Sequence, residues 1–255
     1  MTNESQSRLS LTKVYWLEQT CAAVPPDDDW LSAGETARLN ALRIPKRRAD
    51  WRLGRWTAKR AVSICLNAPR NPKSLAAIEI RPAVTGAPEV FLDNQPAAVT
   101  ISLSHSNGNA LCAVAPPGTE LGCDLEAIEP RSEAFVADYF TIDEQALIAR
   151  ASAAERFQLL ALFWSAKESA LKALREGLRL DTQSVTVSLE ESVPLFALDE
   201  MTADPTFTEC RSIWRPLVVH CASGQVFQGW WGQTGTLLQT VVAAPAPARP
   251  ILLQV

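Results

Sequence analysis

The chain has 255 residues, 47% of them hydrophobic and 20% charged, which is enough to bury one large core or two small ones. Its net charge of −4 argues against a general nucleic-acid coat. Two histidines and six scattered cysteines, with no C-x-x-C pair, argue against a zinc site, so any metal would be held by carboxylates. The polar N-terminus and the absence of a long apolar run predict a cytoplasmic protein without a membrane segment.

The first predicted elements are two helices. Ser32 and Glu35 have the spacing of a capping box and predict a helix start, and a second helix should follow Pro45. Residues 46–60 contain seven Lys and Arg but only one acid, and one face of this helix is cationic. The cations on that face are Arg48, Arg52, Arg55 and Lys59. Such a face is either a solvated surface or a nucleic-acid patch.

The middle of the chain reads as strands. Residues 99–103 alternate between apolar and polar, and the turn at 106–109 predicts a hairpin with His105 at its bend. The next strand places Asp124 and Glu126 on one face, about 7 Å apart along the backbone, where a divalent cation would relieve their repulsion. An isolated D-x-E pair is more often a solvated strand end, so this motif alone does not establish a metal site.

Residues 141–175 have the pattern of a helix, with an apolar stripe at core spacing. Glu168 and Lys172 lie one turn apart on another face, which is the commonest helix-stabilising ion pair. Because Trp164 is beside them, they could instead line a cleft. After a predicted strand at 184–189, the segment AAPAPARP at 243–250 is predicted to be a loose tail, and no sequence repeat is evident.

The order of these features resembles the Sfp-type 4'-phosphopantetheinyl transferases. Signatures of that family are an S-H-S-like turn, a G-x-D-x-E strand and a W-x-x-K-E-x-x-x-K helix. The corresponding residues here are Ser104 to Ser106, Gly122 to Glu126 and Trp164 to Lys172. The resemblance covers residues 46–172, and three ordered motifs make chance a poor explanation.

The resemblance implies an activity. Family members transfer the phosphopantetheine arm of coenzyme A to a serine of an acyl or peptidyl carrier protein of fatty-acid, polyketide or nonribosomal-peptide synthesis. They release adenosine 3',5'-bisphosphate and use Mg²⁺, for which Mn²⁺ is an alternative. By this resemblance Asp124, Glu126 and Glu168 would bind the metal. Lys172 would neutralise the leaving bisphosphate, and Glu168 would also accept the proton of the carrier serine.

The resemblance also implies a set of coenzyme A contacts. The candidate residues are Arg47, Arg48, Arg55, Gly86, Ser104 and His105. One departure concerns the step Gly86-Ala87-Pro88, where the family often has a basic residue in the place of Ala87. A phosphate contact is therefore either missing here or supplied by Arg81.

The family fold is α+β, with two similar halves in a pseudo-twofold arrangement and the active site in the cleft between them. The break at Pro116-Pro117-Gly118 suggests an N-terminal half, 1–117, that binds coenzyme A phosphates, and a C-terminal half, 118–255, that binds metal and carries catalysis. We expect a monomer that binds neither nucleic acid nor membrane. The alternative is a non-catalytic protein that binds a carrier protein or nucleic acid through residues 46–60, with salt-sensitive and Mg²⁺-independent affinity.

Overall fold

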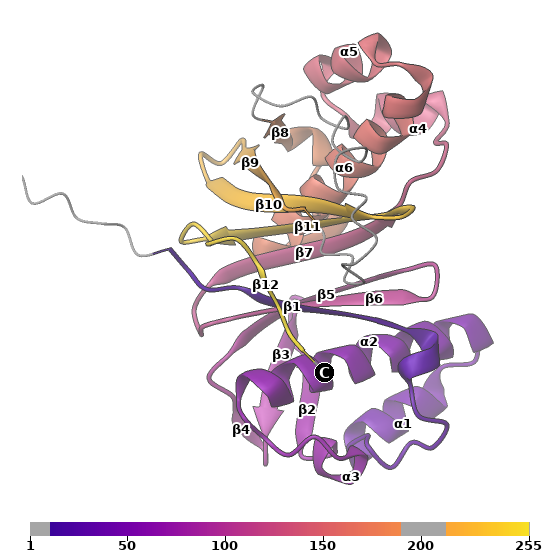
Figure 1. The fold of residues 1–255 in the computed structure, drawn as a ribbon, viewed down its shortest axis with the longest axis vertical. Coiled ribbons are helices and arrows are strands. Elements are labelled where there is room, and N and C mark those ends of the chain that lie inside the picture. Colours follow the sequence, from indigo (N-terminus) through magenta and orange to yellow (C-terminus); the bar gives the residue numbers. More distant parts are fainter. Residues whose placement is uncertain (1–10, 190–212, 255) are drawn as a thin grey trace, which may run out of the picture.

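The fold is α+β, as predicted, and is built around two main sheets (Figure 1). It is taken from a computed structural model that describes residues 11–189 and 213–254. Within those ranges no helix combines the length and the apolar character needed to cross a membrane.

The N-terminal part packs helices against a four-stranded sheet of order β12-β1-β6-β5. Its strands are β1 (Tyr15–Thr20), β5 (Thr100–Ser106), β6 (Asn109–Ala115) and β12 (Ile251–Leu252). The long helix α2 (Pro45–Cys65) covers this sheet through a shared core that includes Leu17, Trp56, Val62 and Cys112. Smaller elements complete this part: η1 (Cys21–Ala23), α1 (Ala33–Ala41), α3 (Pro72–Leu75), β2 (Ile78–Pro82), β3 (Pro88–Leu92) and β4 (Gln95–Pro96).

The C-terminal part repeats the plan of one long helix on a sheet. Its five strands have the order β7-β11-β10-β9-β8 and are all antiparallel. They are β7 (Glu120–Ala127), β8 (Val185–Leu189), β9 (Arg215–Cys221), β10 (Val226–Thr234) and β11 (Leu237–Ala244). The helices are α4 (Glu133–Tyr139), α5 (Ile142–Arg150), α6 (Ala153–Ala173), η2 (Gly177–Arg179) and η3 (Thr182–Ser184). The predicted apolar stripe of α6 lies in the core, from Leu159 to Ala170.

The two sheets face each other across a third apolar cluster. Trp16 of β1 meets Trp214 edge to face, with ring centroids 5.4 Å apart. Where β5 meets β7, the amide of Cys123 donates to the buried hydroxyl of Ser102 over 2.9 Å. The contact between the halves is therefore partly apolar and partly polar, and the predicted break at Pro116 to Gly118 lies between β6 and β7.

Each half contains a buried ion pair built in the same way. Glu35 closes a capping box at the start of α1, accepts the amide of Ile80, and pairs with the Lys59 ammonium at 2.5 Å. In the second half, the corresponding residues form the same set: the glutamate is Glu144 of α5, the amide is that of Val187, and the lysine is Lys167 of α6, at 2.9 Å. The two halves thus share one structural device.

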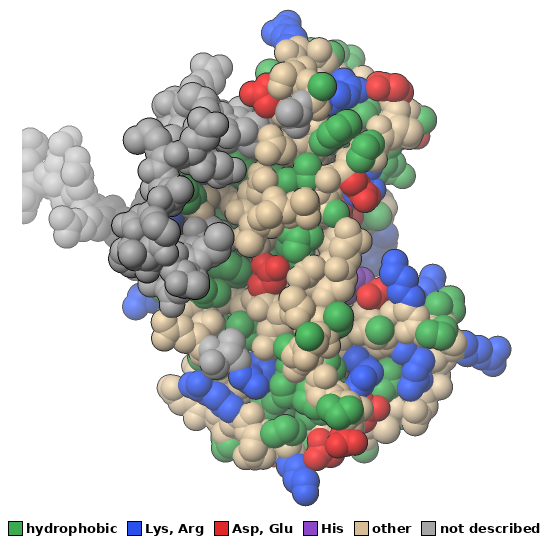
Figure 2. Space-filling view, turned by 45° about the vertical axis from the view of Figure 1, so that its right-hand side comes forward, with side chains coloured by type: hydrophobic (Ala, Val, Ile, Leu, Met, Phe, Trp, Pro, Cys, Tyr) green, Lys and Arg blue, Asp and Glu red, His purple; other side chains and the backbone are tan. Residues whose placement is uncertain are grey.

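The cationic face predicted on α2 is largely committed inside the protein. Lys59 is fully buried, Arg52 binds the Asp28 carboxylate at 2.8 Å, and the Arg48 guanidinium donates to the carbonyls of Leu39 and Leu42. Figure 2 shows blue Lys and Arg side chains over the lower part of the molecule, which contains α1, α2 and α3 together with β2, β3 and β4. The helical periodicity of the sequence correctly placed these cations on one face of α2. It could not show that groups of the protein itself bind most of them.

Two predictions of secondary structure were wrong. The single helix predicted over 141–175 is two helices, because Ser152 begins a new capping box with Glu155. The proline-rich segment 243–250 is not a loose tail, because backbone hydrogen bonds of 2.9 Å join Thr12 to both Ala246 and Ala248. The Ile251 amide donates to Val14 and the Leu253 amide to Trp16, both at 2.8–2.9 Å, so β12 extends the first sheet in parallel to β1. Prolines interrupt only the approach to this strand, whose own amides remain free to donate.

Candidate active site

The candidate site forms where α6 crosses β7 at very short range. A Cβ atom on Gly122 would lie 1.7 Å from the carbonyl oxygen of Ser169, so only glycine allows this approach. Asp124 follows Gly122 by two residues on β7, and Glu168 precedes Ser169 on α6. The crossing therefore brings the strand carboxylates and the predicted helix pair together.

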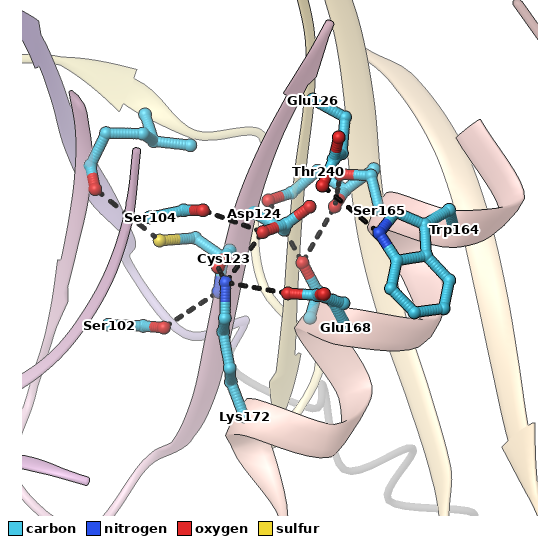
Figure 3. Close-up of polar contacts among 12 residues, drawn as sticks. Ser102, Ser104, Cys123, Asp124, Glu126, Trp164, Ser165, Glu168, Lys172 and Thr240 are labelled. Atoms are coloured by element: carbon cyan, nitrogen blue, oxygen red, sulfur yellow. Dashed lines mark hydrogen bonds and ion pairs between the residues drawn. The ribbon is translucent and has the colours of Figure 1, made fainter. Parts of the chain in front are cut away.

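Asp124 is the centre of the cluster and is only 1% exposed. Its Oδ1 accepts from the Ser104 hydroxyl at 2.7 Å and from the Lys172 ammonium at 2.6 Å (Figure 3). Its other oxygen, Oδ2, is buried and has no hydrogen-bond partner among the described residues. Ser104 belongs to β5, so this carboxylate joins the two halves of the protein.

Lys172 lies between two carboxylates. Besides Asp124, its ammonium contacts Glu168 Oε2 at 3.4 Å and donates to the Cys123 carbonyl at 3.2 Å. Burial lowers the pKa of Lys172, but the charges of Asp124 and Glu168 outweigh that effect and raise it above its usual value. The lysine is therefore held as a cation. Burial, together with the charge of Asp124, raises the pKa of Glu168.

Glu126 lies on the other side of the cluster. Its carboxylate accepts from the Trp164 indole at 3.1 Å and pairs with Arg131 at 3.0 Å. Burial is the main cause that raises its pKa from 4.5 to about 7, and the charges of Asp124 and Glu168 add to it. The three predicted metal ligands therefore repel one another within one small volume.

The raised pKa of Glu126 predicts how stability depends on pH. Below about pH 4.5 the carboxyl is protonated in both states; between 4.5 and about 7 the unfolded chain loses the proton while the folded protein keeps it. In metal-free buffer we expect this group to lower the free energy of unfolding over that window, by at most about 1.4 kcal/mol per pH unit. Denaturant unfolding of Glu126→Gln against the parent chain checks this, with the exposed Glu133→Gln as control. Parallel pH profiles for Glu126→Gln and the parent would contradict it.

A buried hydroxyl cluster behind the carboxylates was not predicted. The Thr240 hydroxyl on β11 lies 2.8 Å from that of Ser165 and 2.7 Å from that of Ser169, both on α6. Thr240 is the β11 residue that pairs with Asp124 in the sheet register. These contacts fix the helix against the strands that carry the acids. No sequence signal short of the pairing register could have identified Thr240.

Beside the carboxylates lies a cavity of about 410 Å³, within the range typical of small-molecule sites. Both halves line it. The residues predicted for coenzyme A or for catalysis that line it are Arg55, Gly86, Ser104, His105 and Lys172. Arg55 stacks over the Trp51 ring at 4.9 Å, and its Nε is buried without a hydrogen-bond partner among the described residues. Burial lowers the pKa of this guanidinium.

Three other candidates for phosphate binding lie elsewhere. Arg47 is exposed, Arg48 is bonded to backbone carbonyls, and neither is among the lining residues. Arg81 pairs with Glu79 at 2.7 Å and stacks on Phe91, and it does not line the cavity either. The lining residues that sequence reasoning missed include Trp51 and Arg175. Arg175 follows the lysine of the helix motif by three residues, which is the signal that could have identified it.

The carboxylates fit a hard divalent cation in their chemistry, since oxygen donors suit Mg²⁺. The unpartnered Oδ2 of Asp124 is the specific observation that favours such an ion. In the part of the chain that the structure describes, no three His, Cys, Asp or Glu side chains already form a ready metal site. Lys172 stands between Asp124 and Glu168, so this ammonium would have to withdraw for one ion to reach both.

One comparison with known proteins agrees with the motifs. Residues 120–212 match the family model of the 4'-phosphopantetheinyl transferase superfamily. No curated protein matches the chain. Among solved structures, a holo-(acyl-carrier-protein) synthase from Bacillus anthracis in complex with CoA (3',5'-ADP) is 20% identical, with a TM-score of 0.35 over 42% of this chain and 97% of that one. The part of the chain that holds Asp124, Glu168 and Lys172 thus carries the signature of the 4'-phosphopantetheinyl transferase superfamily, which confirms the family predicted from the motifs and leaves the Sfp type as a prediction.

Proposed function

We propose that this chain transfers the 4'-phosphopantetheine arm of coenzyme A to a serine of an acyl or peptidyl carrier protein. The observation that carries the proposal is the composition of one cavity. Arg55 and His105 of the N-terminal part and Lys172 of the C-terminal part line it together, and Lys172 contacts the buried carboxylate of Asp124. Cations for phosphates thus adjoin acids for a metal, as phosphoryl transfer requires.

The phosphates of coenzyme A would bind to the cationic side of the cavity. Arg55 has a buried N–H without a partner among the described residues, and its nearest carboxylate, on Glu35, is 3.8 Å away. A phosphate oxygen would satisfy that donor and form a charge-assisted bond. Gly86, with φ of +88°, shapes the turn that forms the opposite wall, and no atom lies within 4 Å of where its Cβ would be.

Asp124, Glu126 and Glu168 would hold Mg²⁺ or Mn²⁺. When bound, the ion would neutralise charge on the pyrophosphate oxygens. Lys172 would stay charged and stabilise the leaving adenosine 3',5'-bisphosphate. Glu168 would accept the proton as the serine oxygen forms its bond to phosphorus and the pyrophosphate P–O bond breaks. A raised pKa makes its carboxylate a stronger base than an exposed glutamate, which favours this role.

We also propose the division of labour expected from the sequence, with phosphate binding in residues 1–117 and metal binding in 118–255. The return of β12 to the first sheet is the exception to a simple division of the chain. A monomer is expected, because the cavity is lined by both halves of one chain. The nucleic-acid alternative has less support, since Arg48, Arg52 and Lys59 all bind groups of the protein itself.

The direct test is incubation with coenzyme A, Mg²⁺ and apo carrier proteins of fatty-acid, polyketide and peptide synthesis, read by intact mass. One phosphopantetheine arm should be added to at least one carrier, because all parts of the site are present. Addition should stop when the carrier serine is replaced by alanine or when EDTA removes the metal. If a folded protein that binds coenzyme A modifies no carrier, the transferase proposal is wrong.

A further inference from the structure

The wall of the cavity formed by the turn between β2 and β3 has no cation of its own. The family resemblance described above implies a basic residue in the place of Ala87, and both Gly86 and Ala87 line the cavity. Arg81, the substitute expected from the sequence, is held by Glu79 and by Asn94 at 2.7 and 2.5 Å. Arg81 also stacks on Phe91, 4.2 Å from the ring centroid, and it is not among the residues that line the cavity.

Another cation lines the same cavity from the opposite half. Arg175 follows Leu174, the C-cap residue of α6, and is about half exposed. Its nearest carboxylate oxygen, on Glu89, is 3.8 Å away and belongs to a side chain that is also about half exposed. An ion pair of that length and exposure is weak and screened by salt. The guanidinium therefore remains available to a ligand.

The backbone conformation of Arg175 is one that an arginine rarely adopts. Its φ is +59°, a left-handed conformation in which glycine is normally favoured. The Arg175 amide donates to the Lys172 carbonyl and the Glu176 amide to the Leu171 carbonyl, at 3.0 and 3.1 Å, which is a Schellman motif with Arg175 at the glycine position. The backbone alone would favour glycine here, so the arginine occupies this position at a local conformational cost.

The two walls are held together at this point. Arg179 donates to the Arg175 carbonyl at 2.8 Å and to the Thr85 carbonyl at 3.2 Å. Thr85 precedes Gly86 in the turn, so Arg179 ties the turn that lacks a cation to the segment that carries Arg175. Figure 1 places this turn and the end of α6 in different halves of the chain, and the bond from Arg179 joins them.

We propose that Arg175 binds a phosphate of coenzyme A in place of the cation that Ala87 lacks. The proposal rests on the proposed function, because it takes coenzyme A as the ligand. It assigns one phosphate contact of the N-terminal wall to a residue of the C-terminal half. The positive charge would then reach the phosphate from a residue that lies next to the turn and belongs to the other half.

Calorimetric titration with coenzyme A tests this with Arg175→Gly, the combined variant Arg175→Gly with Ala87→Lys, and Arg156→Ala as a control far along α6. Arg175→Gly should bind about 10- to 100-fold more weakly, as expected for a lost charge-assisted bond. Its melting temperature should stay at or above that of the parent, because glycine suits the backbone. The Ala87→Lys change should restore most of the affinity, and Arg156→Ala should bind like the parent.

Titration with dephospho-coenzyme A identifies the phosphate. A loss by Arg175→Gly that is confined to coenzyme A assigns the 3'-phosphate, and an equal loss for both ligands assigns the pyrophosphate. Unchanged affinity of Arg175→Gly, or failure of Ala87→Lys to restore it, would overturn the proposal and leave the transferase intact. If Arg81→Ala weakens coenzyme A binding and Arg175→Gly does not, the phosphate contact belongs to Arg81 and the proposal is overturned. A parent chain that binds no coenzyme A would overturn the proposed function itself.

Discussion

Gly122→Ala should lower the free energy of unfolding by at least about 3 kcal/mol, more than most single substitutions. The new methyl group would lie 1.7 Å from the Ser169 oxygen, 2.7 Å from its carbonyl carbon and 2.9 Å from the Ala173 nitrogen. All three atoms are helix backbone, so relief requires α6 to move away from β7 rather than a side chain to rotate. Chemical denaturation followed by circular dichroism measures the loss.

Gly54 provides a matched control. It lies inside α2, and no atom is within 4 Å of the position of its Cβ. Gly54→Ala should raise the free energy of unfolding by about 0.5–1 kcal/mol, the usual gain when alanine replaces glycine in a helix. If Gly122→Ala were as stable as the parent, α6 and β7 could separate without cost. Gly122, the glycine of the G-x-D-x-E motif, would then have no role in positioning the acids.

Local signals in the sequence predicted much of the fold. The capping box of Ser32 and Glu35 located the start of α1, because its hydrogen bonds join residues three apart. The hairpin at 106–109 followed from Asn107 and Gly108, whose φ angles of 46° and 74° are those that asparagine and glycine adopt most readily. The motif order predicted that strand acids and helix acids would meet, and Asp124, Glu168 and Lys172 do lie together.

What could not be predicted depends on contacts between distant segments. The repeated ion pairs join Glu35 to Lys59 and Glu144 to Lys167, and two residues per half are too few to form a recognisable repeat. The parallel pairing of β12 with β1 connects the two ends of the described chain, and alternation within so short a strand gives no signal. A pattern of apolar residues reports which faces are buried but not which partners bury them.

The same limit applied to the site. Ser104 was predicted as a neighbour of coenzyme A, yet its hydroxyl donates to Asp124, so it positions a carboxylate across the contact between the halves. Trp164 was noted only as a flanking aromatic residue, and its indole donates to Glu126. Both roles require knowledge of how β5, β7 and α6 meet. Residue types were therefore predictable at this site, whereas their hydrogen-bond partners were not.

Glu168→Gln should reduce the rate of transfer to a carrier by at least about 10²-fold, the lower end of what a general base contributes. The amide keeps the shape of the side chain but can neither accept the proton nor give a metal its charge. Asp124→Asn should likewise remove activity, because its buried carboxylate contacts Lys172 at 2.6 Å and its Oδ2 has no hydrogen-bond partner among the described residues. Single-turnover transfer, read by intact mass, measures both effects.

Stability separates a catalytic role of these acids from a structural one. Since burial and the charge of Asp124 raise the pKa of Glu168, its ionised form is disfavoured in the folded protein, and Glu168→Gln should melt no lower than the parent in metal-free buffer at neutral pH. Mg²⁺ should raise the melting temperature of the parent and of the control Glu133→Gln, by mass action on the folded state, but should hardly affect Asp124→Asn. If Asp124→Asn is inactive because it has unfolded, its carboxylate has a structural role. If Glu168→Gln is fully active, transfer does not need the Glu168 carboxylate, and the catalytic assignment is wrong.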